Sequence, residues 1–125
     1  MLLDTHTLLW FLEDDSRLPL TLRSQIENSD SVFTSIISIW EIAIKQSINK
    51  LALKFEFQDL PNVLDELEIR VLPLTFADAA QYRSLPLHHR DPFDRMLIAQ
   101  AITNSLAIAS ADPAFDAYPI QRMWA

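Results

Sequence analysis

Short apolar segments alternate with helix-like segments along the chain, and this alternation constrains the fold more than any other feature. The apolar segments have the length of strands: 1–4, Ser31–Thr34, Ile69–Leu72 and Leu106–Ala109. The segments between them have helical spacing of apolar residues: Thr5–Leu12, Pro19–Asn28, Ser35–Asn49, Leu60–Glu68, Phe76–Leu85 and Pro92–Asn104. Strands that alternate with helices favour a parallel sheet covered on both faces. We therefore predict an α/β fold with a mostly parallel central sheet and helices on both faces.

Length and composition fit one intracellular domain. At 125 residues and 14.4 kDa the chain is long enough to bury a core, so we expect a single domain spanning residues 1–125. Cysteine is absent, which excludes disulfides and thiolate zinc sites. The apolar N-terminal stretch is interrupted by Asp4 and His6, so neither a signal peptide nor a membrane span is expected. These features predict a cytoplasmic protein that does not enter a membrane.

The net charge limits the kinds of partner. The formal charge is -7 and the pI is near 4.7, which argues against a broad basic surface of the kind that binds nucleic acid non-specifically. A nucleic-acid partner would have to bind at a local site rather than across a broad basic surface. A cluster of acids that binds divalent cations would offset part of the negative charge.

Glycine is wholly absent, although the chain needs many turns. Asn49 and Asn104 stand where helices are expected to end, and asparagine tolerates the left-handed backbone conformation better than most residues. We expect both asparagines to act as left-handed caps.

An acid lies on the apolar face of the last long helical segment. The positions three, four and seven residues after Asp94 share its face and are apolar: Leu97, Ile98 and Ala101. A carboxylate in such a place is costly unless it is paired, hydrogen-bonded or bound to a metal. Asp94 therefore needs a chemical reason to be there.

Three further acids occupy comparable positions. Asp4 ends the first strand, Glu41 lies in the helix after the second, and Asp112 follows the penultimate strand. In open α/β sheets ligands bind beyond the carboxyl ends of the strands, so these acids can converge with Asp94. Carboxylate oxygens suit Mg²⁺ or Mn²⁺, and two such ions can hold the attacking and leaving oxygens of phosphodiester hydrolysis. The pattern predicts a divalent-metal site made of Asp4, Glu41, Asp94 and Asp112.

Each of these acids also has a purely structural interpretation. Asp4 and Asp112 can act as helix N-caps, and so can Asp91, which precedes Pro92. Asp94 would then be an acid in the first helical turn, favoured by the helix dipole.

Glu41 can likewise close a capping box with Ser38. However, caps normally lie at the solvent edge, whereas Glu41 falls on an apolar stripe with Ile37, Ile44 and Ile48. Because Asp94 also interrupts an apolar stripe, the four acids taken together favour the metal site.

Several basic or hydroxyl side chains accompany the acids. Arg95, His88 and His89 can meet RNA phosphates, orient a water or simply balance the carboxylates. Lys45 lies four residues after Glu41, so it is either a helical ion-pair partner or a phosphate contact.

Four motifs together resemble the PIN-domain ribonucleases, specifically the VapC-type toxins of bacterial toxin-antitoxin pairs. The resemblance covers almost the whole chain, and its third motif is the most specific. The motifs are Leu2-Leu-Asp-Thr-His-Thr-Leu-Leu-Trp10, Ser38-Ile-Trp-Glu-Ile-Ala-Ile-Lys45, His89-Arg-Asp-Pro-Phe-Asp-Arg-Met-Leu-Ile-Ala-Gln-Ala101 and Ser110-Ala-Asp-Pro-Ala-Phe115.

The resemblance implies an activity and partners. It implies an RNA endonuclease, a homodimer, and an antitoxin whose tail occupies the acidic groove. Carried over by motif, the family's magnesium-binding acids are the four named above. Ser110 stands where the family often has threonine, which preserves the hydroxyl.

Two other functions remain open at this point. A phospho-receiver-like signalling domain is also a small doubly wound fold with an acidic magnesium pocket, but the segment Ile69–Leu72 is followed by no phosphoacceptor aspartate. The other alternative is a catalytically silent binding module that retains the fold.

Overall fold

The computed structural model describes residues 1–124 and contains a five-stranded sheet in which every neighbouring pair of strands is parallel. The strand order is β3-β2-β1-β4-β5. The strands are β1 Leu2–Leu3, β2 Val32–Ser35, β3 Ile69–Leu72, β4 Ile108–Ala109 and β5 Arg122–Met123. The predicted parallel α/β fold is confirmed, although β4 is shorter than the apolar segment suggested.

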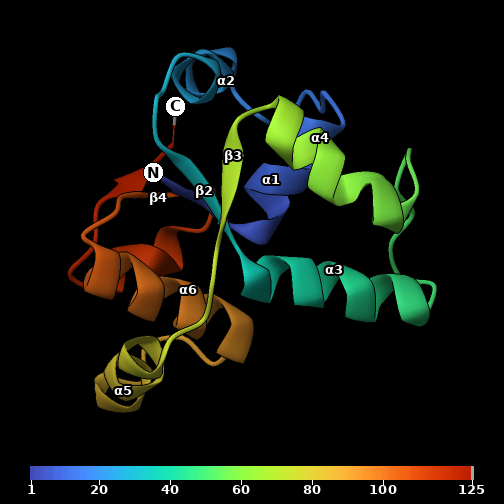
Figure 1. Cartoon of the computed structure of the whole chain (residues 1–125). Helices are drawn as coiled ribbons and strands as arrows, with labels where there is room; N and C mark the ends of the chain where they lie inside the picture. Colours follow the sequence, from blue (N-terminus) through green and yellow to red (C-terminus); the bar gives the residue numbers. More distant parts are fainter. Residues whose placement is uncertain (125) are drawn as a thin grey trace.

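Helices connect the strands and cover both faces of the sheet (Figure 1). The α-helices are α1 Thr5–Leu12, α2 Leu20–Glu27, α3 Ile36–Ser47, α4 Leu60–Glu66, α5 Phe76–Ser84 and α6 Pro92–Asn104. Short 3₁₀ turns, η1 and η2, cover Phe57–Asp59 and Pro113–Ala117. Among residues 1–124, no helix has both the length and the apolar character needed to cross a bilayer.

The core consists of two apolar clusters, one on each face of the sheet. Successive strand residues point to opposite faces, so Leu3 and Ala109 belong to one cluster while Leu2 and Ile108 belong to the other. The first cluster collects apolar residues of α1, α2 and α4, and the second is built around α6. Burial on both faces explains why β1 and β4 are wholly apolar rather than alternating.

The strand order places a topological switch point between β1 and β4. The chain builds from β1 outward to β2 and β3, then crosses to β4 and β5 on the other side of β1. Loops leaving β1 and β4 therefore diverge, and in open α/β sheets ligands bind at the carboxyl ends of strands at such a point. Receiver domains have their first and third strands side by side, whereas here β3 lies at an edge, so the receiver-like alternative is wrong.

The apolar stripe predicted for α3 is only partly buried. Ile37 is buried as expected, but Ile44 is half-buried and Ile48 is exposed. The buried face instead runs through Glu41 and Ile42. Since α3 extends beyond the sheet in Figure 1, its C-terminal half has no sheet to cover.

The two expected asparagine caps have different outcomes. Asn49 follows α3 with a positive φ of 57°, which confirms the prediction. The prediction for Asn104 is wrong by one residue, because Asn104 is the last residue of α6 and Ser105 takes the left-handed conformation. The Asn104 amide instead donates to the Gln100 carbonyl 2.8 Å away.

Substituting glycine at these adjacent positions should have opposite effects on stability. Ser105→Gly removes the cost of a side chain at positive φ, so the free energy of unfolding should rise by about 0.5 to 1 kcal/mol. Asn104→Gly places glycine inside a helix, so the free energy of unfolding should fall by a similar amount, about 0.5 to 1 kcal/mol. Urea denaturation of both variants measures this difference, and a stabilised Asn104→Gly protein would contradict the assignment of the cap.

Candidate acidic metal site

Asp4 and Asp112 stand at the switch point, immediately beyond β1 and β4. Each caps the helix that follows through one oxygen: Asp4 Oδ1 accepts from the Thr7 N–H and Asp112 Oδ1 from the Ala114 N–H, both at 2.9 Å. The Asp4 N–H donates to the Ala109 carbonyl, which joins the ends of the two strands. Ser110 is fully buried and its hydroxyl accepts from the Asp112 N–H at 3.0 Å.

Asp94 approaches Asp112 from the first turn of α6. His89 lies between them, with Nε2 3.2 Å from Asp94 Oδ2 and 3.1 Å from Asp112 Oδ2. One donor atom from each of these three residues lies within 4.8 Å of the others, which is metal-ligand spacing. Asp91, three residues earlier, is the N-cap of α6 and accepts from the Phe93 N–H at 2.8 Å. The helix therefore uses one aspartate as its cap and directs the other to the site.

Glu41 is held at the site by hydroxyl and ammonium groups. Thr5 Oγ1 donates to Glu41 Oε1 at 2.7 Å, and Lys45 Nζ lies 3.1 Å from Glu41 Oε2. The alternative interpretation of Glu41, a capping box with Ser38, is wrong, because α3 begins at Ile36 and its N-cap is Ser35. The Ser38 hydroxyl instead lies 2.9 Å from Thr5 Oγ1. Thr5 thus connects α1 with the acid on α3.

The pKa of Asp94 depends on its burial and on three neighbouring acids, Asp91, Asp4 and Glu41. Burial raises the pKa of this carboxyl, and the negative charges of Asp91, Asp4 and Glu41 raise it further. The nearby His89 opposes these effects, but the pKa still rises from 3.8 to about 7. Asp4 and Glu41 lie outside the tight group formed with His89, yet they are close enough to disfavour the charge on Asp94.

The carboxyl of Asp112 behaves in the opposite way. Burial alone would raise its pKa, but hydrogen bonds from the Ala114 N–H and from His89 lower it below its ordinary value, with help from the charge of Arg122. Two carboxylates that share one histidine therefore differ in how easily they ionise.

Arg95 belongs to the support of the site. Its side chain is 7% exposed, and its guanidinium donates to the Pro86, His89 and Leu85 carbonyls at 3.0 to 3.4 Å. It also stacks over Tyr82. This geometry fits a role in holding the loop 85–91 better than a contact with substrate. Lys45 forms the helical ion pair with Glu41 that the spacing suggested.

Two supporting residues were missed by sequence reasoning. Thr5 had a weak signal, because it follows Asp4 directly in the first motif. Tyr118 had none: its hydroxyl accepts from the His88 and His89 N–H groups and donates to the Pro86 carbonyl, contacts that span about thirty residues.

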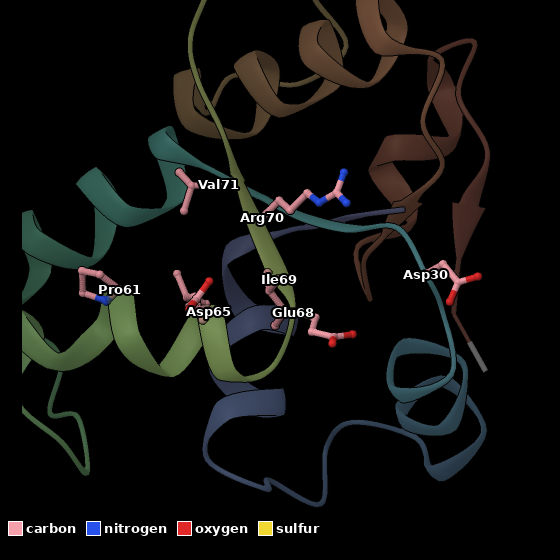
Figure 2. Close-up of a pocket in the computed structure, with 8 residues that line it drawn as sticks. Asp30, Pro61, Asp65, Glu68, Ile69, Arg70 and Val71 are labelled. Carbon is pink, nitrogen blue, oxygen red and sulfur yellow. The ribbon is translucent and has the colours of Figure 1, made fainter.

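A hollow lies away from these acids, at the edge of β3 (Figure 2). Its volume is about 660 Å³, and its lining includes Asp30, Asp65, Glu68 and Arg70. Asp30 precedes β2 and Glu68 precedes β3, so the hollow faces the amino ends of the strands. Ligand crevices of parallel sheets lie at the carboxyl ends, where the four acids are.

The donor set of the site suits a hard divalent cation. Burial and the negative charges of Asp91, Asp4 and Glu41 disfavour a charge on Asp94, and a bound cation would offset both effects. Mg²⁺ and Mn²⁺ prefer carboxylate oxygen ligands, and both keep water molecules in their coordination shell.

Known proteins share both the sequence pattern and the fold. A model of the PIN domain family matches residues 1–121. Ribonuclease VapC22 of Mycobacterium tuberculosis is 27% identical over 113 residues, covering 90% of this chain and 86% of that protein.

Solved structures agree in fold at lower identity. The crystal structure of VapBC2 from Rickettsia felis bound to a DNA fragment from their promoter gives a TM-score of 0.72 at 12% identity, over 99% of this chain and 98% of that one. The structure of DNA-bound VapBC from Salmonella typhimurium gives a TM-score of 0.67 at 18% identity, over 98% of this chain and 95% of that one. The structure of FitAB bound to an IR36 DNA fragment gives a TM-score of 0.65 at 18% identity, over 98% of this chain and 92% of that one.

The fold and the site define an α/β domain with acids gathered at the switch point of a parallel sheet. The chain belongs to the PIN domain family. The resemblance to VapC-type PIN-domain ribonucleases that the four motifs indicated is confirmed.

The raised pKa of Asp94 should make metal-free protein less stable as the pH rises. Between about pH 4 and 7 the folded protein holds a proton on Asp94 that the unfolded chain has lost, so the free energy of unfolding falls across this window and levels off above it. Asp94→Asn should remove this slope. At pH 8 it should stabilise metal-free protein by about 1 to 2 kcal/mol, less than the full shift because the carboxyl is partly exposed.

Urea denaturation in EDTA from pH 5 to 8 measures the difference between the two proteins. A constant difference across the range would contradict the assignment of the raised pKa to Asp94. With saturating Mg²⁺ the wild-type protein should become the more stable of the two, since only it has the complete carboxylate set.

Proposed function

We propose that this protein is a metal-dependent endoribonuclease that acts as the toxin of a toxin-antitoxin pair, with its nuclease domain spanning residues 1–125. The observation that carries the proposal is a set of acids near the switch point of a PIN-family sheet: Asp94 and Asp112 share His89, and the charges of Asp4 and Glu41 act on Asp94. Similarity to Ribonuclease VapC22 supports RNA as the substrate.

In this proposal the four carboxylates hold Mg²⁺ or Mn²⁺. The ion would supply a hydroxide equivalent near neutral pH and neutralise charge on the phosphate. The acids orient it from four different elements, because Asp4 follows β1, Glu41 lies on α3, Asp94 on α6 and Asp112 after β4. Such a site is rigid, since each acid is fixed by its own element rather than by a shared loop.

The surrounding residues prepare these carboxylates for their task. Thr5 and Lys45 fix the Glu41 side chain by a hydrogen bond and an ion pair. Ser110 fixes the backbone of Asp112, and Asp91 leaves Asp94 free by taking over the helix cap. The half-exposed ammonium of Lys45 is also placed to meet a phosphate once a cation binds Glu41.

Loss of a ligand should separate catalysis from folding. Asp4→Asn and Asp94→Asn should fold and lose RNA cleavage by at least about 100-fold, because each removes a charge from the metal site. Asp91→Asn is the matched control: asparagine caps a helix about as well as aspartate, so cleavage should persist. Asp91→Ala should lower the free energy of unfolding by about 0.5 to 2 kcal/mol and retain some activity.

An RNA cleavage assay with Mg²⁺, Mn²⁺ or EDTA, run beside thermal melts of these variants, tests the assignment. Activity that survives EDTA would sink the metal mechanism. An inactive Asp91→Asn protein together with an active Asp94→Asn protein would show that the ligand is the other aspartate. A folded, metal-binding wild-type protein that cuts no RNA would favour the silent binding module.

The proposal includes an antitoxin and a second copy of the chain as protein partners. VapBC and FitAB complexes share the fold, which supports a protein partner here. A homodimer is supported by exposed apolar side chains, among which Phe76 is 92% and Leu87 73% exposed. Light scattering of the purified protein tests the dimer.

The antitoxin should inhibit by placing a basic segment in the acidic groove, because clustered carboxylates attract arginine or lysine from outside. A peptide with such a segment should inhibit cleavage, and raising the Mg²⁺ concentration should weaken the inhibition. A co-encoded protein that bound tightly without affecting RNA cleavage or metal binding would contradict direct blocking.

A further inference from the structure

His89 joins two of the proposed metal ligands, and the proposed function gives it no part. Its Nε2 lies 3.2 Å from Asp94 Oδ2 and 3.1 Å from Asp112 Oδ2. Asp94 comes from α6 and Asp112 follows β4, so a single imidazole ties two separate elements together. The side chain is only 15% exposed, which favours these contacts over contacts with water.

The other ring nitrogen reveals where the proton lies. The Asp91 backbone N–H donates to His89 Nδ1 over 3.2 Å. An acceptor nitrogen must be unprotonated, so the neutral ring carries its proton on Nε2, the nitrogen that faces the carboxylates. In this tautomer Nε2 has no lone pair to give to a metal ion, and it can only donate.

The backbone around His89 is fixed before any ligand binds. Tyr118 Oη accepts from the His89 N–H at 2.9 Å, and the Arg95 guanidinium donates to the His89 carbonyl at 3.4 Å. The imidazole packs on Phe115, with 5.7 Å between ring centroids. The backbone of His89 and one face of its ring are therefore both held, with Nδ1 toward the Asp91 N–H and Nε2 toward the carboxylates.

We propose that His89 is a positioning residue that holds Asp94 and Asp112 together as a hydrogen-bond donor and does not bind the metal itself. This inference rests on the proposed function for the identity of the metal ligands. The hydrogen bonds engage one oxygen of each carboxylate and fix the orientation in which the remaining lone pairs face a cation. Coordination then stays with oxygen, which favours Mg²⁺ and Mn²⁺ over the ions that prefer imidazole.

The tautomer is tested directly on metal-free protein. Two-bond ¹H–¹⁵N correlation spectra of ¹⁵N-histidine-labelled protein distinguish the two neutral forms of each ring. We expect the Nε2–H form for His89, with Asp91→Asn retaining it because the contact uses the backbone N–H. Observation of the Nδ1–H form would overturn the proposal without reference to any activity.

The positioning role is tested by Mn²⁺ binding followed by electron paramagnetic resonance. His89→Ala should weaken binding by about 10-fold, in the range found for supporting partners of metal ligands. His89→Gln keeps an N–H donor at a similar reach and should recover most of the affinity. His88→Ala is the matched control, since His88 is an exposed neighbour whose ring contacts Tyr118 and no carboxylate.

Pulsed measurements on the Mn²⁺-loaded wild-type protein separate a donor from a ligand. No ¹⁴N coupling of a directly bound imidazole is expected. A coupling that disappears in His89→Ala would make His89 a ligand and overturn the proposal, as would unchanged Mn²⁺ affinity in that variant. Absence of Mn²⁺ binding to the wild-type protein would instead contradict the proposed function itself.

Discussion

Repulsion among carboxylates at one edge of the sheet is the constraint on which the site depends. Parallel strands bring their carboxyl ends to the same edge, so acids that follow different strands are forced together. Burial raises the pKa of Asp94 to about 7, and the charges of Asp91, Asp4 and Glu41 add to the rise. The surrounding groups limit the repulsion by donating hydrogen bonds or positive charge, as Thr5 and Lys45 do for Glu41. The site is thus held in a state that a divalent cation would stabilise further.

Capping and metal binding are compatible because a carboxylate has two oxygens. Asp4 and Asp112 each use Oδ1 for a helix cap, and Oδ2 of Asp112 faces His89. The cap fixes the side-chain torsions, which lowers the entropy that would be lost on binding a cation. The two interpretations of these aspartates, which compete when the sequence is considered alone, therefore describe two atoms of the same side chain. On α6 the tasks are divided between Asp91, which caps the helix, and Asp94.

The sequence predicts what depends on local pattern and on strand order, and it fails where distant segments meet. Apolar strands and helical spacing gave the parallel α/β fold, and Asp94 was found because it interrupts an apolar face. The sequence left a capping box open as an alternative for Glu41, because the actual partner, Thr5, is 36 residues away and no local rule reveals it. The cap after α6 was displaced from Asn104 to Ser105 because helix ends depend on a single residue's backbone angles. Tyr118 left no signal, since its contacts are purely tertiary.

Arg95 shows how one helix can serve the site from two sides. Successive helical residues point about 100° apart, so Arg95 faces the loop 85–91 while its neighbour Asp94 faces the carboxylates. A buried guanidinium is costly unless its N–H groups are satisfied, and the loop carbonyls satisfy them here. The loop in turn carries His89, whose backbone is held by Arg95 of α6 and by Tyr118, while its ring packs on Phe115. Because Phe115 and Tyr118 follow β4, as Asp112 does, the position of His89 between Asp94 and Asp112 depends on how α6 packs against the segment that follows β4.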